Sequence, residues 1–225
     1  MAKKRAEKIN FSEQLQCFQI KKFKAITENQ QEYINIINNS TITFVEGPSG
    51  CGKSYVATAC GVKLLLENKI EKIIITRPIV ECDEHIGFLP GQFFDKVLPY
   101  MIPVLDVLLE FLTPKQLQAY QDDKIIEICP LAYMRGRSLH NSYIIGDELQ
   151  NASYKQLKML LTRIGYNSKM VLNGDVSQSD VGGQNNAFEF CLNRLCDVNG
   201  IGIIKLEKVD IVRNEIISRI LEKLD

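Results

Sequence analysis

The sequence predicts an α/β protein built on a doubly wound, mainly parallel β-sheet. From about residue 41 onward, short apolar runs alternate with longer stretches of helical pattern. The apolar runs are continuous instead of alternating, which is typical of strands buried on both faces of a parallel sheet. A glycine-rich segment joins the first run to the first helical stretch, as expected where a strand turns tightly into a helix.

The expected strands are residues 42–45, 73–75, 125–128, 143–145, 170–172 and 201–204. The expected helices are residues 53–67, 93–112, 154–164, 186–196 and 215–224, the second of them interrupted by Pro99 and Pro103. Ligands of such sheets bind at the carboxyl ends of the strands. Polar residues that follow the apolar runs are therefore the first candidates for a site.

Length and charge suggest one domain with a small attachment. We expect a basic N-terminal extension over residues 1–24, with seven Lys/Arg, and a single domain over residues 25–225. The extension is either a nucleic-acid-binding arm or a solvated end. Lys+Arg and Asp+Glu balance at 27 each, so the overall charge argues neither for nor against a nucleic-acid partner.

Hydrophobicity and cysteine content indicate a cytoplasmic protein without a membrane segment. No apolar run approaches the roughly 20 residues that span a bilayer. The seven cysteines form no C-x-x-C pair, and we interpret them as reduced core thiols.

The segment from Gly47 to Ser54 fits G-x-x-x-x-G-K-[ST] at every fixed position. In such a loop the backbone N–H groups surround phosphates, Lys53 reaches the β- and γ-phosphates, and the Ser54 hydroxyl ligates Mg²⁺. A chance glycine-rich turn would not account for the strand before it and the helix after it. The predicted nucleotide-binding residues are Gly47, Pro48, Ser49, Gly50, Cys51, Gly52, Lys53, Ser54 and Tyr55.

Two carboxylates, Asp147 and Glu148, end the run at residues 143–145. Asp147 is predicted to hold Mg²⁺ through water, and Glu148 to act as the general base for an attacking water. Acidic pairs also follow strands on ordinary surfaces, but the phosphate loop upstream favours the catalytic interpretation.

The next strand end reads Gly-Asp-x-x-Gln, with Asp175 and Gln178 as its polar residues. The Gln178 amide both donates and accepts, so it could contact the γ-phosphate or its water. An Asx turn built on Asp175 explains the same pattern, and both interpretations remain open.

Together these motifs resemble the PhoH-like ATPases, over about residues 28–224. Residues 76–81 are similar to that family's T-R-P-x-V-E, 86–91 to L-G-F-L-P-G, 130–139 to P-L-A-Y-M-R-G-R-T-L, 147–151 to D-E-A-Q-N, and 210–214 to D-V-V-R-H. The resemblance implies a P-loop NTPase with a RecA-like single motor lobe, related to the first lobe of superfamily-1 helicases. It also implies an ATPase linked to RNA or single-stranded DNA.

The resemblance also implies roles for several polar side chains. Arg213 matches a helicase arginine finger, whereas Arg77, Arg135 and Arg137 are candidates for nucleic-acid or interface contacts. For each arginine a salt bridge is the alternative. Gln30 resembles a glutamine that reads adenine, although Gln31 beside it leaves the assignment open.

Only one motor lobe fits, so we expect a homo-oligomer, a hexameric ring among its possible forms, with the arginine finger supplied by a neighbouring copy. A P-loop small-molecule kinase and a nucleotide-dependent binding module with little turnover are the alternatives. Two departures from the family pattern stand out. Gly146 replaces a bulky apolar residue, which is expected to loosen the strand end, and residues 179–186 replace the family's usual loop sequence.

Overall fold

A single parallel sheet organises the chain. The computed structural model describes residues 23–79, 93–178 and 186–212, and within them six strands pair in the order β3-β2-β4-β5-β1-β6, all parallel. The strands are β1 (Ile42–Glu46), β2 (Lys72–Arg77), β3 (Ile126–Pro130), β4 (Ser142–Gly146), β5 (Lys169–Gly174) and β6 (Ile201–Lys205). The expected fold class and all six expected strands are confirmed.

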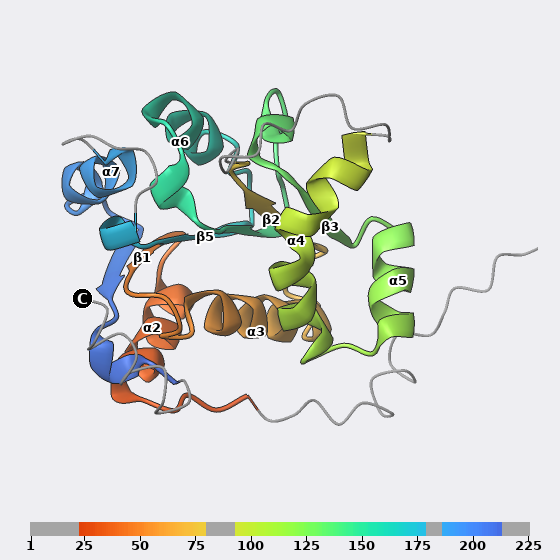
Figure 1. Ribbon diagram of the computed structural model, residues 1–225, viewed down its shortest axis with the longest axis horizontal. Helices are drawn as coiled ribbons and strands as arrows, with labels where there is room; N and C mark the ends of the chain where they lie inside the picture. Colours follow the sequence, from red (N-terminus) through yellow and green to blue (C-terminus); the bar gives the residue numbers. More distant parts are fainter. Residues whose placement is uncertain (1–22, 80–92, 179–185, 213–225) are drawn as a thin grey trace, which may run out of the picture.

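Helices cover both faces of the sheet. They are α2 (Glu28–Asn39), α3 (Lys53–Leu66), α4 (Phe93–Leu109), α5 (Pro114–Asp122), α6 (Tyr154–Leu161) and α7 (Ala187–Leu195). In Figure 1, α2 and α3 lie below the sheet and α6 and α7 above it. The sheet is therefore the middle of three layers, as expected for a doubly wound fold.

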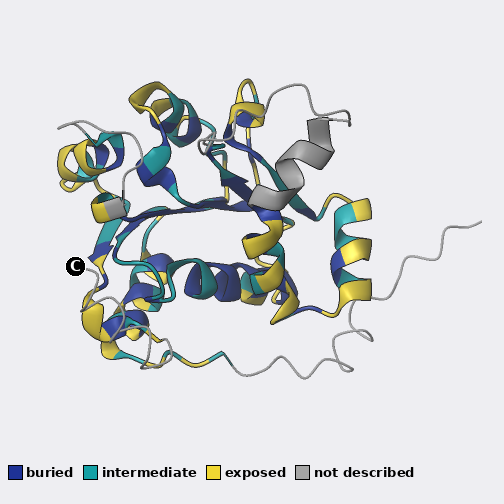
Figure 2. Ribbon diagram, in the orientation of Figure 1, coloured by how far each residue is buried: buried dark blue, intermediate teal, exposed yellow. Residues whose placement is uncertain are grey.

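Each face of the sheet has its own hydrophobic core. Tyr33, Val56 and Leu108 belong to the core on the α3 side, and Leu157 and Phe188 belong to the core on the α6 side. Figure 2 shows the strands and α3 as the most buried elements. This burial on both faces explains why the strand sequences are continuously apolar.

Two helices were not predicted, and a third differs from the expectation. Helix α2 begins at the N-cap Thr27 and has its apolar residues only from Tyr33 onward, whereas α5 has a capping box between Thr113 and Gln116 that the sequence displays. Helix α4 runs without interruption through both of its prolines. The expected helix at 215–224 lies outside the described residues. Among the described helices, none is long and apolar enough to cross a membrane.

Gly146 does not loosen the end of β4. It pairs in register with Thr76 and Leu172. A Cβ at this position would lie 2.8 Å from Leu149 and 3.2 Å from Leu160. These leucine side chains occupy the space that a bulkier residue would take, so the departure from the family pattern is compensated by packing.

Replacing Gly174 with alanine is expected to lower the free energy of unfolding by about 1–3 kcal/mol, because overpacking a rigid core costs that much. The new Cβ would lie 2.6 Å from the fully buried Phe188 ring, which has no room to move. Urea denaturation measures the change. In a Phe188→Leu background the penalty should shrink, and a penalty of the same size there would contradict this explanation.

Candidate active site

The glycine-rich loop lies between β1 and α3, at the carboxyl edge of the sheet. Gly50 and Gly52 have φ values of 85° and 88°, which side-chain-bearing residues rarely adopt. A Cβ on Gly47 would lie 2.9 Å from the carbonyl oxygen of Leu206. The Gly52 N-cap offers no side-chain hydrogen bond to α3, so the helix N-terminus can bind an anion.

Lys53 lies across this loop. Its ammonium group donates to the carbonyl oxygens of Gly47 and, at 2.9 Å, Pro48. It makes no ion pair with a carboxylate in the described part of the chain. The charge is therefore held at the centre of the loop, where phosphate oxygens can replace the carbonyls as acceptors.

The structure brings Ser54 and Asp147 together from distant parts of the sequence. The Ser54 hydroxyl donates to Asp147 Oδ1 at 2.6 Å, and Asn173 Nδ2 donates to the same oxygen at 3.3 Å. Tyr33 in turn donates to Asn173 Oδ1 at 3.1 Å, and burial raises the pKa of its hydroxyl well above the usual value. The pair is thus held by a buried network.

A hydroxyl beside a carboxylate at the end of a phosphate-binding loop is a donor set that Mg²⁺ prefers, since this ion takes one or two protein oxygens together with phosphates and water. The residues therefore fit the ion. No cluster of three or more His, Cys, Asp or Glu side chains that could hold a metal occurs among the residues with described coordinates. A site made entirely of protein ligands is not seen there.

Glu148 is held by side chains from the end of β2 and from the short helical turn that follows Glu148. Its φ of 53° is in the left-handed region, which is uncommon for a residue with a side chain and typical of functional sites. Arg77, at the end of β2, lies 3.1 Å from Glu148 Oε1, and Gln150 Nε2 donates to Oε2 at 2.6 Å. The carboxylate is oriented and still 39% exposed, so water can reach it.

Gln150 also joins Glu148 to β5. Its Oε1 accepts from the Asp175 N–H at 3.0 Å, and its side chain is buried. The Asp175 carboxylate accepts from the Ser177 N–H at 3.1 Å, which is the Asx turn considered as the alternative. The Gln178 side chain lies outside the described residues, so its contact with phosphate stays a prediction.

Residues 22–225 match the family described as PhoH-like protein. The chain belongs to the PhoH-like protein family. It is 42% identical over 200 residues to the PhoH-like protein of Synechocystis sp., covering 88% of this chain and 61% of that one. It is 41% identical over 206 residues to the PhoH-like protein of Bacillus subtilis, covering 91% and 65%.

The PhoH-like chain spans under two thirds of the length of these relatives. Among solved structures it is similar to the large terminase of a thermophilic bacteriophage. The TM-score is 0.61 at 8% sequence identity, over 90% of this chain and 51% of the other. At 8% identity this likeness shows that the two chains share a fold.

Gln30, and not Gln31, contacts the phosphate loop of the PhoH-like chain. Its Nε2 donates to the Cys51 carbonyl at 3.2 Å and its Oε1 accepts from the Ile26 N–H at 2.9 Å. Gln31 instead donates to Asn35. Both ends of the Gln30 amide are engaged by backbone, so it supports the loop in this arrangement, and adenine recognition stays a prediction.

The four arginines that the family resemblance singles out differ in their surroundings. Arg137 forms the salt bridge considered as the alternative, with Nη2 2.7 Å from Glu127. Arg77 also forms a salt bridge, with Glu148 at the predicted site, whereas Arg135 is exposed beside a groove. Arg213 lies outside the described residues.

Two further residues that were predicted to bind nucleotide, Tyr55 and Cys51, pack against neighbouring side chains or are buried. The Tyr55 ring packs against the tilted rings of Phe23 and Phe111, with ring centroids 5.8 and 5.1 Å away. Cys51 is buried, and this burial raises the pKa of its thiol although Lys53 opposes the shift. All described cysteines are free, but Cys196 is exposed, so the expectation of core thiols is wrong for that residue.

A clasp that was not predicted joins the residues after β6 to the site. Asp210 is fully buried and accepts from Thr27 Oγ1 and Asn29 Nδ2, at 2.5 and 2.9 Å. Two residues later, the Val212 N–H donates to the Gly50 carbonyl at 3.2 Å. No sequence pattern could reveal this, since Asp210 and Thr27 are 183 residues apart.

Replacing Asp210 with asparagine is expected to lower the free energy of unfolding at pH 7 by about 1–3 kcal/mol, because partly buried donors lose a charged acceptor that is itself fully buried. Burial alone would raise the pKa of Asp210, but hydrogen bonds from Glu207, Thr27 and Asn29 outweigh it, and the pKa is lowered.

The depressed pKa sets the sign of the pH dependence. The stabilisation is present above the unfolded pKa of about 3.9 and is lost as the pH falls through the folded pKa. Urea denaturation of wild type and Asp210→Asn between pH 7 and pH 3 should show the difference shrinking below about pH 4. A difference that grows on acidification would contradict the assignment.

Proposed function

We propose that the chain binds ATP with Mg²⁺ and hydrolyses it, and that hydrolysis is coupled to binding of RNA or single-stranded DNA. The observation that carries the catalytic half is the 2.6 Å contact between Ser54 and Asp147 at the phosphate loop. Membership of the PhoH-like family supports a P-loop NTPase.

The chain's own residues divide the work of hydrolysis. Backbone N–H groups of the loop and the Lys53 ammonium bind the phosphates and balance their charge. Ser54 and Asp147 would hold Mg²⁺, which neutralises charge on the phosphate oxygens. Glu148, oriented by Arg77 and Gln150, accepts the proton of the attacking water.

Hydrolysis also needs a positive charge beside the transferred phosphoryl group. We assign this role to Arg213 from a neighbouring copy in a homo-oligomer. Light scattering of the chain with and without nucleotide tests the arrangement. A monomer with full turnover would contradict it.

The coupling is tested by phosphate release from ATP, measured with and without single-stranded RNA or DNA. We expect turnover that needs Mg²⁺ and rises with a single strand. Turnover that no nucleic acid changes would leave the ATPase and remove the coupling. Competition by GTP in the same assay tests the preference for adenine.

A further inference from the structure

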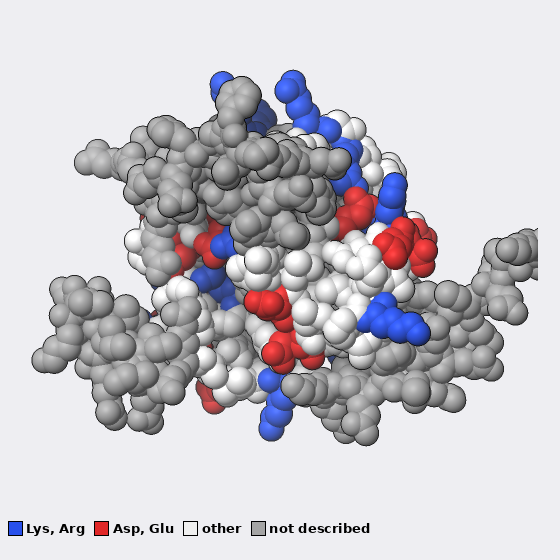
Figure 3. Space-filling view, turned by 45° about the vertical axis from the view of Figure 1, so that its right-hand side comes forward, with Lys and Arg blue, Asp and Glu red and all other residues white. Residues whose placement is uncertain are grey.

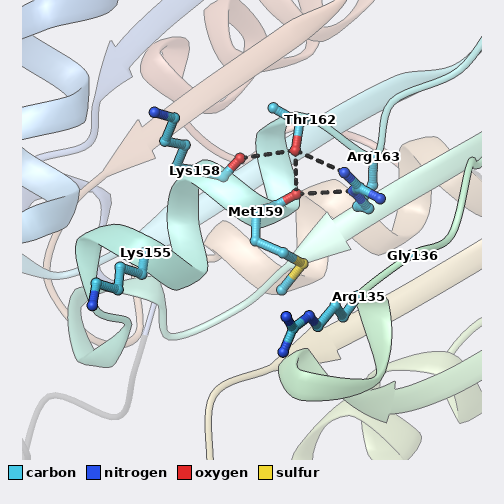
Figure 4. Close-up of a pocket in the computed structure, with 7 residues that line it drawn as sticks. All are labelled: Arg135, Gly136, Lys155, Lys158, Met159, Thr162 and Arg163. Carbon is cyan, nitrogen blue, oxygen red and sulfur yellow. Dashed lines mark hydrogen bonds between the residues drawn. The ribbon is translucent and has the colours of Figure 1, made fainter.

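A basic groove lies outside the nucleotide site, on the α6 side of the sheet. One wall is the loop after β3, and the other is one face of α6, as Figure 4 shows. The groove has a volume of about 510 Å³ and is lined by Arg135, Gly136, Lys155, Lys158, Met159, Thr162 and Arg163. Four of these seven residues carry a positive charge, and none carries a negative one.

The charge around the groove is set by a long part of the sequence. Residues 128–146 and 149–174 contain six Lys/Arg and no Asp or Glu. On the face in Figure 3, by contrast, basic and acidic side chains lie interspersed. In a chain with no net charge, this segregation creates a local positive field that attracts a polyanion.

These charges are largely free to bind a ligand. Arg135, Lys155 and Lys158 form no ion pair with any residue in the described ranges. Arg163 donates to the carbonyl oxygens of Met159 and Arg137, at 3.2 and 3.1 Å. It thereby ties α6 to the opposite wall, and no carboxylate neutralises its charge within the described residues.

An exposed aromatic pair lies next to Lys155 of the groove, where α6 meets α7. Tyr154, one helical turn before Lys158, is 49% exposed, and Phe190 of α7 is 53% exposed. Their rings meet edge to face with centroids 5.6 Å apart. Single-stranded nucleic acid is bound by such a combination, in which cations contact the phosphates and aromatic rings stack on the bases.

We infer that this groove binds single-stranded nucleic acid, with phosphates on Arg135, Lys155 and Lys158 and a base on Tyr154. The inference rests on the nucleic-acid half of the proposed function and gives it a location. One wall, α6, follows the segment that carries Glu148, and the other follows β3, whose last residue pairs with Arg77. A nucleic-acid strand that contacts both walls would therefore lie against the element that directly follows the Glu148 segment.

The test measures binding of fluorescent oligouridylate, and of oligothymidylate in parallel, to wild type and to a Lys155→Gln/Lys158→Gln variant. The variant should bind at least about 10-fold more weakly. The negative slope of log binding constant against log salt should become less steep by about 1.4, or 0.7 for each lost phosphate contact. The matched control is Lys63→Gln/Lys69→Gln, which removes two exposed lysines far from the groove in sequence. It should bind like wild type.

A second variant separates stacking from charge. Tyr154→Ala should weaken single-strand binding by about 5- to 100-fold with an unchanged salt slope, and should leave duplex binding nearly unaffected because paired bases hide their faces. ATP hydrolysis without nucleic acid should be the same in all these variants. That measurement also shows that the variants are folded.

Three results would overturn the inference. If the lysine variant binds both oligonucleotides like wild type while they still stimulate hydrolysis, the strand binds elsewhere and the coupling stands. If wild type binds neither oligonucleotide, both the groove and the coupling fail, and the ATPase is untouched. If the variants change only the mass of the assembly, the groove is an interface between copies of the chain.

Discussion

Replacing Glu148 with glutamine is expected to lower phosphate release from ATP by about 10²–10⁴-fold, the usual contribution of a general base. Glutamine keeps the shape of the side chain and one acceptor for Arg77 or Gln150, but it cannot take the proton of the attacking water. ATP binding should change little, because Glu148 is not part of the phosphate loop. Phosphate release and nucleotide affinity, measured on the same samples, separate the two effects.

Glu127→Gln is the matched control for this variant. Glu127 also pairs with an arginine, at 2.7 Å from Arg137, but it belongs to β3 and is not in contact with Ser54, Asp147 or Glu148 in the described structure. Its loss should cost some stability and little turnover. If Glu127→Gln lowered the rate as much as Glu148→Gln, loss of an ion pair, and not of the base, would explain both.

Replacing Lys53 with alanine is expected to weaken ATP binding by about 10- to 100-fold, since hydrogen bonds between charged groups contribute about 1.5–3 kcal/mol. In the structure the ammonium group contacts carbonyls of the loop itself, those of Gly47 and Pro48. Because these contacts are not part of the hydrophobic core, the variant should fold normally. Calorimetric titration with ATP and Mg²⁺ measures the loss.

Lys63→Ala is the control for Lys53, because it removes an exposed lysine from the same helix. It should bind ATP like wild type. Unchanged affinity in Lys53→Ala would contradict the assignment of the loop as the phosphate site.

The sequence predicted the parts of the molecule in which local pattern and chemistry coincide. A local sequence pattern identifies each of three features: the glycine loop, the buried strands and the pair Asp147–Glu148. The parallel sheet then explains why Ser54 meets Asp147, since both lie at its carboxyl edge.

The parts that were missed depend on contacts between distant segments. Tyr33 and Asn173 are 140 residues apart and form a hydrogen bond beside Asp147. Asp210 begins a family motif, but its contacts with Thr27 and Asn29 have no local pattern. Gln150 was visible within the D-E-x-Q motif, but only the structure shows that it holds both Glu148 and the residue after β5. The groove could have been found from the sequence, because residues 149–174 carry four Lys/Arg without an acid.

A hydrolytic site formed by this phosphate loop and these strand ends must release phosphate from ATP. The decisive measurement is the rate of phosphate release by the wild-type chain with Mg²⁺, with Glu148→Gln as background. We expect release well above that background, abolished when a chelator removes Mg²⁺. Equal rates for wild type and Glu148→Gln, with ATP bound by both, would contradict the account.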